Sequence, residues 1–136
     1  MKVLFDTNII VDIIAKREGY MESLQLLKYC EMRKISGFVT AITITDLMYI
    51  LRKHISPDYV REAVQNLILI VDVADVLKTD ISSAFLNKFN DFEDAVQSSC
   101  AKRIEADYIV TRNVKDFVNS EITALLPMKL LNIITV

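Results

Sequence analysis

Short apolar runs alternate along this sequence with longer stretches of helical periodicity. The apolar runs lie at residues 3–5, 38–40, 68–73, 108–111 and 122–126. Between them, apolar residues such as Leu24 and Leu27 recur at the spacing of a helix face. Strands that alternate with helices form a parallel sheet through right-handed crossovers, with helices packed on both faces. The pattern therefore predicts an α/β fold, a three-layer α/β/α sandwich around a mainly parallel five-stranded sheet.

The composition favours one compact domain. Apolar residues make up 52% of the 136 residues, and the chain has only two Gly and two Pro. A core of adequate size is therefore available, and no stretch is typical of a linker. We expect a single domain spanning residues 1–136. The net charge of −2 argues against a general nucleic-acid binder coated in Lys and Arg, although a local basic rim remains compatible with it.

The few histidines and cysteines exclude several classes of site. His54 is the single histidine, which argues against a His-rich zinc site and against a Ser-His-Asp triad. Cys30 and Cys100 lack the spacing of a zinc or redox motif, so we expect two buried thiols in a reducing compartment. The sequence shows neither a leader pattern nor an apolar run of about 18 residues. We therefore expect a soluble, cytoplasmic protein with no membrane span.

The first apolar run ends in a carboxylate, a hydroxyl and an amide, at Asp6, Thr7 and Asn8. In open α/β sheets, ligands bind at the carboxyl ends of the strands. Asp6 is therefore a candidate site residue. The alternative is that Asp6 or Thr7 only caps the helix that follows.

Further acids stand near the predicted starts of two later helices. One helix is predicted to open at Thr43, with an acid at the spacing of a capping box. The other opens with an acidic cluster, which the helix dipole would stabilise without any catalytic role. The acids concerned are Asp46 in the first helix and Asp91, Glu93 and Asp94 in the second.

Polar residues also follow the predicted fourth strand, and they converge with Asp6 if the first and fourth strands are neighbours. These residues are Thr111, Asn113 and Asp116. Carboxylates held within a few ångströms of one another require either raised pKa values or a cation. The motifs contain no histidine, so the pattern favours a hard ion, Mg²⁺ or Mn²⁺. Such an ion activates water for attack on a phosphodiester, which points to nucleic acid as the substrate class.

Together these motifs resemble the PIN domain. The segments are Val-Leu-Phe-Asp-Thr-Asn at 3–8, Asp46 on an apolar helix, Asp-Phe-Glu-Asp-Ala at 91–95, and Ala-Asp-Tyr-Ile-Val-Thr-Arg-Asn-Val-Lys-Asp-Phe at 106–117. Their order and spacing agree with the family over essentially the whole chain. The resemblance implies a parallel sheet in an α/β/α sandwich, and the family includes metal-dependent ribonucleases such as the VapC-like toxins.

The resemblance assigns roles to individual residues. It implies Asp6, Asp46 and Asp94 as catalytic acids, with Asp6 and Asp94 as the ligands of Mg²⁺ or Mn²⁺. The supporting residues are Thr7, Asn8, Asp91, Thr111, Asn113 and Asp116. The second acid is usually Glu, so Asp46 has a shorter reach. The fourth position is often Asp, and Asn113 keeps an oxygen there without the charge; Asp116 could take its place.

The resemblance also implies partners: an RNA substrate, a second copy of the chain and an antitoxin protein. Basic residues near the motifs could hold RNA phosphates or could be ordinary solvated charges. They are Arg112 and Lys115, which we take as the substrate-binding pair, and Arg52, Lys53, Lys102 and Arg103. The apolar run 41–51 and the helix from Tyr20 exceed what one sheet face should bury, so they could form a homodimer interface or simply belong to the core.

The main alternative is a non-catalytic or weakly active PIN-type module that binds RNA or protein. Two other α/β classes fit poorly. A receiver domain needs paired Asp residues after the first strand and a Lys after the last, where this chain has Thr7-Asn8 and Pro127. A phosphatase of the Asp-x-Asp kind needs a second Asp where the chain has Asn8.

Overall fold

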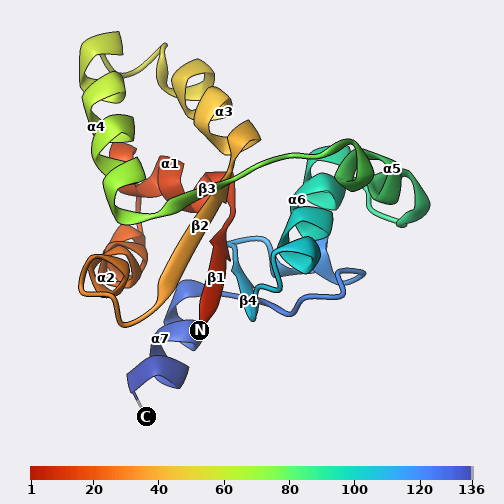
Figure 1. Cartoon of the computed structure of the whole chain (residues 1–136). Coiled ribbons are helices and arrows are strands. Elements are labelled where there is room, and N and C mark those ends of the chain that lie inside the picture. The colour runs from red at the N-terminus through yellow and green to blue at the C-terminus, as the bar shows by residue number, and fades with distance from the viewer. Residues whose placement is uncertain (136) are drawn as a thin grey trace.

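The computed structural model describes residues 1–135 as a five-stranded parallel sheet between two helical layers (Figure 1). The strands are β1 (Lys2–Phe5), β2 (Ser36–Thr40), β3 (Asp72–Ala74), β4 (Tyr108–Val110) and β5 (Ala124–Leu125). The helices are α1 (Thr7–Ala15), α2 (Tyr20–Glu31), α3 (Ala41–Leu51), α4 (Pro57–Ile70), α5 (Lys78–Leu86), α6 (Phe92–Arg103), the 3₁₀ segment η1 (Val114–Phe117) and α7 (Pro127–Thr135).

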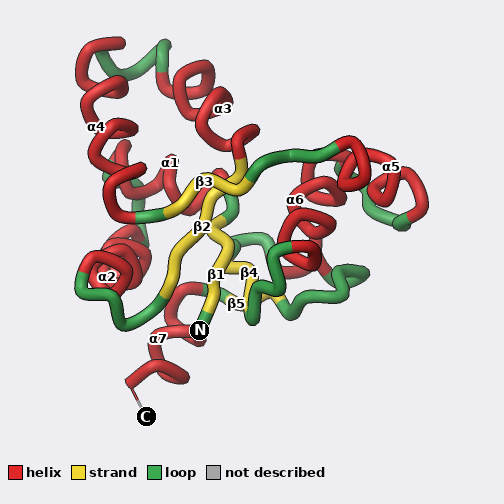
Figure 2. Tube along the Cα trace, in the orientation of Figure 1, coloured by secondary structure: helices red, strands yellow, loops and turns green. Residues whose placement is uncertain are grey.

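The strand order is β3-β2-β1-β4-β5, which places β1 at the centre of the sheet (Figure 2). Leu4 on β1 pairs with Phe38 on β2 and with Ile109 on β4, and all the pairings are parallel. The predicted α/β sandwich is confirmed, and so is the expected contact between the first and fourth strands. The strand order reverses next to β1, which is the point where a crevice opens at the carboxyl edge of such a sheet.

Side chains of β1 alternate between the two layers. Val3 and Phe5 pack into a core formed with α1, α2, α3, α4 and α7, whereas Leu4 faces the other way, toward α6 and η1. The α5–α6 hairpin adds a smaller cluster on that second face. Helix α1 is apolar nearly all round and is buried, as its sequence predicts. The central strand is therefore enclosed on both faces, and its carboxyl end is held firmly in place.

The third strand is shorter and later than predicted. Residues 68–70 form the last turn of α4, and β3 begins only at Asp72. The buried stripe Val60, Val64 and Leu67 keeps helical spacing to the end of α4, while Leu69 is 84% exposed. The prediction of a strand over 68–73 was wrong because a short apolar run does not by itself distinguish a helix end from a buried strand.

Three helix boundaries also differ from the predictions. Helix α3 begins at Ala41 and is capped by Thr40, whose Oγ1 accepts a hydrogen bond from Thr43 N at 3.4 Å. The predicted Thr43–Asp46 capping box is therefore wrong, and Asp46 lies on the second turn of the helix. The helical pattern also predicts one helix from residue 75 and a second that ends near residue 106, whereas α5 begins at Lys78 and α6 ends at Arg103.

Two further expectations concern the cysteines and the membrane. Cys30 and Cys100 are both free and buried, as predicted. Within residues 1–135, the helices are all too short or too polar to cross a bilayer.

Candidate active site at the carboxyl edge of the sheet

A cleft of about 210 Å³ opens beyond the carboxyl ends of β1 and β4. Six of the side chains that line it are acidic, and among the described residues that line it none is basic. The acids are Asp6, Asp46, Asp91, Glu93, Asp94 and Asp116, and the other lining residues are Thr7, Asn8, Ile50 and Asn113. The structure therefore brings together the three predicted catalytic acids and all but one of the predicted supporting residues, Thr111, which lies directly behind Asp6. We call this set of six acids the acidic cleft.

Asp6 lies between β1 and α1 and is 5% exposed. It occupies the N-cap position, but its side chain makes no capping hydrogen bond. Its Oδ2 instead accepts a hydrogen bond from Thr111 Oγ1 at 2.8 Å, across the β1–β4 pair. Burial raises the pKa of Asp6, although the hydrogen bond from Thr111 opposes this effect. The capping explanation of Asp6 therefore fails.

The first turn of α6 supplies three acids with two different roles. Asp91 is the N-cap, because its Oδ1 accepts from Asp94 N at 3.0 Å, so this acid has a structural role at the start of α6. Asp94 is left free to face the cleft. Burial, followed by the negative charges of Asp6 and other acids, raises the pKa of Asp94 to about 7.

Glu93 is the acid that sequence reasoning did not assign to the site. Burial raises its pKa to about 8, and so do a hydrogen bond and charge repulsion from Asp46. It was left aside because the helix dipole alone explains a Glu in a first turn. The sequence offered only an indirect signal, the unusually short second acid Asp46, because Glu93 lies far from it along the chain. Glu93 brings a longer carboxylate to the position where Asp46 has one methylene fewer than Glu.

Three buried polar side chains meet behind the acidic cleft. Thr7 Oγ1 lies 2.8 Å from Thr43 Oγ1, and Gln97 Nε2 donates to these two hydroxyls at 3.3 and 3.1 Å respectively. Gln97 and Thr43 are 1% and 0% exposed. We call Thr7, Thr43 and Gln97 the hydroxyl–amide triad. Gln97 was not predicted, because a polar residue on a helix face shows nothing in the sequence of a partner far away in the chain.

Three of the basic residues predicted near the site form ion pairs with acids outside the cleft. Arg112 Nη1 donates to the buried carboxylate of Asp12 at 3.0 Å, although its charge still lowers the pKa of Asp6. Arg103 pairs with Asp80, and Lys102 pairs with Glu121. Lys115 lies exposed on η1, next to the cleft residue Asp116.

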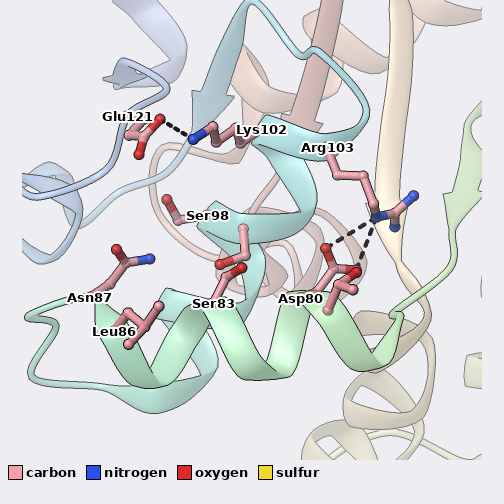
Figure 3. Close-up of a pocket in the computed structure, with 10 residues that line it drawn as sticks. Asp80, Ser83, Leu86, Asn87, Ser98, Lys102, Arg103 and Glu121 are labelled. Carbon is pink, nitrogen blue, oxygen red and sulfur yellow. Dashed lines mark hydrogen bonds and ion pairs between the residues drawn. The ribbon is translucent and has the colours of Figure 1, made fainter.

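A larger cavity of about 450 Å³ lies away from the acidic cleft, beside the α5–α6 hairpin (Figure 3). Asp80 on α5 and Arg103 on α6 form an ion pair at one end, and Lys102 with Glu121 forms another. The charges in this cavity are thus balanced by ion pairs. The smaller acidic cleft is the better candidate for chemistry, because its charges are uncompensated.

Comparison with known families agrees with this geometry. The family model described as PIN domain matches residues 2–115. The chain belongs to the PIN domain family. The match covers β1 through the start of η1, and so includes the acids of the cleft except Asp116.

Solved structures share the fold of this PIN domain at low sequence identity. It is similar to a chain of VapBC2 from Rickettsia felis bound to a DNA fragment from their promoter, with a TM-score of 0.74 and 17% identity over 93% of this chain and 98% of that one. It is also similar to a chain of a toxin–antitoxin complex from Klebsiella pneumoniae, with a TM-score of 0.69 and 21% identity over 92% and 97% of the two chains. No curated protein shows significant sequence similarity to it.

The donor atoms of this PIN domain suit a hard divalent cation. Carboxylate, amide and hydroxyl oxygens line the cleft, and Mg²⁺ is bound in proteins by a few such groups together with water. Within residues 1–135, no three Asp, Glu, His or Cys side chains form a preassembled cage for a metal. Burial and the neighbouring acids raise the pKa values of Asp94 and Glu93, as expected for carboxylates that face one another without a cation.

Proposed function

We propose that this PIN domain is a metal-dependent ribonuclease that hydrolyses RNA phosphodiesters with Mg²⁺ or Mn²⁺. The observation that carries the proposal is the acidic cleft, in which partly buried carboxylates face one another with no basic residue among those lining it. Asp6 and Asp94 would hold the ion, with Asp46 and Glu93 beside them. When bound, such an ion supplies a lower pKa for an attacking water and compensates the charge that develops on the departing oxygen.

The chain's own residues prepare the cleft for this role. The Thr111 hydroxyl fixes the orientation of the Asp6 carboxylate, and Thr111 Oγ1 in turn accepts from Asn113 N at 3.0 Å. Asp94 and Glu93 must lose their protons before they can bind a cation, so we expect affinity for the ion to rise with pH. In this proposal Lys115 on η1 would contact a phosphate, and Arg112 would support the site while paired with Asp12. The choice of RNA as the substrate rests on the family.

We also propose that this ribonuclease is the toxin of a toxin–antitoxin pair and that it forms a homodimer in the cytoplasm. Several of its structural neighbours come from toxin–antitoxin complexes. Exposed apolar side chains are available for an interface, including Tyr49 and Ile50 on α3 and Leu69 on α4. Only part of the run at 41–51 is exposed, since Thr43, Leu47 and Leu51 are buried.

A cleavage assay tests the enzymatic proposal. Mixed RNA is incubated with the protein and Mn²⁺, with and without EDTA, and the variant Asp6→Asn is compared with Asp58→Asn, which changes an exposed acid in the first turn of α4 that does not line the cleft. We expect cleavage that EDTA and Asp6→Asn abolish and that Asp58→Asn leaves unchanged. Cleavage that survives EDTA would contradict the proposal. RNA binding without cleavage would favour the alternative, a binding module.

Expression and sedimentation test the toxin and the dimer. Induction of the wild-type chain alone should arrest growth, and induction of Asp6→Asn should not. The purified Asp6→Asn protein should sediment as a dimer at tens of micromolar, roughly the range in which an interface of ~1,000 Å² already associates. Normal growth at a high level of wild-type protein would exclude the toxin role, and a monomer would exclude the dimer.

A further inference from the structure

Each residue of the hydroxyl–amide triad lies close in sequence to one of the three predicted catalytic acids. One member directly follows the acid of its segment, and the other two lie one helical turn away from theirs, three residues along the helix. Residues at this spacing lie on the same face of a helix. The pairs are Thr7 with Asp6, Thr43 with Asp46 and Gln97 with Asp94.

The triad joins elements that otherwise pack apart. Helices α1 and α3 belong to one layer, whereas α6 packs mainly on α5, β4 and η1 in the other. The three hydrogen bonds span 36, 54 and 90 residues of sequence; the first joins α1 to α3, and the two from Gln97 cross between the layers at the carboxyl edge of the sheet. They therefore set how α6 and its acids are placed relative to α1 and α3.

Stability alone does not account for the glutamine. Gln97 Oε1 is buried and has no hydrogen-bond partner within residues 1–135, and an unpaired buried acceptor destabilises a fold. A methionine has nearly the same length, fits apolar surroundings and carries no such atom. A polar residue here is explained if its amide specifies the relative position of the helices.

We propose that Thr43 and Gln97 are positioning residues that, together with Thr7, hold α1, α3 and α6 in the arrangement in which their carboxylates share one cation. This inference rests on the proposed function, because only a shared ion requires that arrangement. Without the triad each carboxylate is still present, but mutual repulsion is free to move the three elements apart. Loss of a partner that orients metal ligands typically weakens metal binding about 10- to 100-fold.

The test compares metal affinity with stability in the full chain. The variants Thr43→Val and Gln97→Met keep the side-chain size but remove the hydrogen bonds, and Thr43→Ser restores a hydroxyl. Ser98→Ala is the matched control, because it removes a hydrogen bond of 2.7 Å to Ser120 from the neighbouring position on α6. Mn²⁺ affinity is measured by calorimetry, and the urea midpoint is measured in EDTA.

We expect about 10-fold weaker Mn²⁺ binding in Thr43→Val and Gln97→Met. Thr43→Ser and Ser98→Ala should bind as the wild type does. The urea midpoint of Gln97→Met should equal or exceed that of the wild type, which a purely structural role would not produce. Wild-type affinity in both Thr43→Val and Gln97→Met, or a loss that follows the fall in midpoint across all variants, would overturn the inference.

Hydrogen exchange separates this inference from the proposed function. If the wild type binds no Mn²⁺, the proposal of a metal-dependent ribonuclease is wrong. The positioning role of the triad is still tested, by hydrogen exchange of the backbone amides of Asp46 and Asp94. We expect faster exchange at both amides in Thr43→Val and Gln97→Met than in Ser98→Ala. Equal rates in the three variants would show that the triad does not hold these helices in place.

Discussion

Helix α6 contacts acidic side chains at both of its ends, Asp80 of α5 at one end and the acidic cleft at the other, and the pKa values of these acids shift in opposite directions. At its carboxyl end, Arg103 Nε donates to both oxygens of Asp80 at 3.1 Å, and Cys100 Sγ lies 3.4 Å from the same carboxylate (Figure 3). Burial alone would raise the pKa of Asp80, but these hydrogen bonds and one from Leu77 N hold it below its usual value. At the amino end, the acidic cleft has no such cation, and its pKa values are raised.

The direction of the pKa shift therefore distinguishes an acid that pairs with a basic side chain, at one end of α6, from acids that face one another, at the other end. A paired carboxylate such as Asp80 stabilises the fold in its charged form. Unpaired carboxylates such as Asp94 destabilise the fold when charged, and the cation of the proposed function would offset that repulsion. Four measurements test this contrast.

Cleavage of RNA should show the largest difference between the two ends of α6. Asp6→Asn removes a proposed ligand of the ion, and we expect its cleavage rate to fall by at least about 100-fold. Asp80→Asn leaves the cleft intact, so its rate per folded molecule should stay within about twofold of the wild type. Rates are measured with labelled RNA and Mn²⁺ at a temperature where circular dichroism shows both variants folded. Equal losses in the two variants would remove the distinction.

The free energy of unfolding at neutral pH, unlike the cleavage rate, should depend strongly on Asp80. Asp80→Asn breaks a partly buried ion pair, and we expect a loss of about 2 kcal/mol in the free energy of unfolding. The folded-state pKa of Asp80 is lowered, so this contribution is present above the unfolded value and is lost as pH falls through the folded pKa. Urea unfolding at pH 7 and pH 3 measures both points. Glu121→Gln, in the exposed pair with Lys102, is the control and should change stability by less than about 1 kcal/mol.

Asp94→Asn should stabilise the metal-free protein. The folded-state pKa of Asp94 is raised to about 7, so the folded state binds its proton more tightly than the unfolded state does. Ionisation therefore destabilises the fold in full above pH 7, and the penalty disappears below the unfolded pKa near 4. Because the side chain is partly open to solvent, we expect a gain of only about 1 kcal/mol at pH 8 in EDTA, and none at pH 3. A loss of stability at pH 8 would contradict the repulsion argument.

Thiol labelling gives the smallest effect. Burial raises the pKa values of Cys30 and Cys100 to about 12, so neither thiol should react in the folded wild type at pH 8. Because Asp80→Asn weakens the contact between α5 and α6, we expect Cys100 to be labelled before Cys30 in this variant. Mass spectrometry of the labelled peptides measures the order. Simultaneous labelling would mean that the hairpin opens only when the whole domain unfolds.

Much of the fold was predictable because it depends on local patterns. Alternating apolar runs and helical stretches led to the parallel sheet, and polar residues after the first and fourth strands marked its carboxyl edge. The strand predicted at 68–73 failed because its apolar residues also suit a helix end, where Leu69 stays exposed. Asp6, Asp46 and Asp94 were found because each belongs to a recognisable local motif.

The rest of the site depends on contacts between residues distant in sequence. Gln97 reaches Thr43 across 54 residues, and Arg112 reaches Asp12 across 100, so neither pairing leaves a local pattern. Glu93 was visible in its motif but already had a sufficient local explanation in the helix dipole. Its place in the acidic cleft becomes apparent only when α3 brings Asp46 beside it.

The distance in sequence between Asp6 and Thr111 has a consequence for synthesis of the protein. Asp6 leaves the ribosome well before Thr111, whose hydroxyl orients its carboxylate and lies 105 residues later in the chain. Asp116 follows later still. Because β1 pairs with β4 in the centre of the sheet, the nascent chain has an incomplete cleft until nearly all of the domain has emerged. The ribosome that synthesises this domain is therefore not exposed to a complete cleft until translation of the domain is almost over.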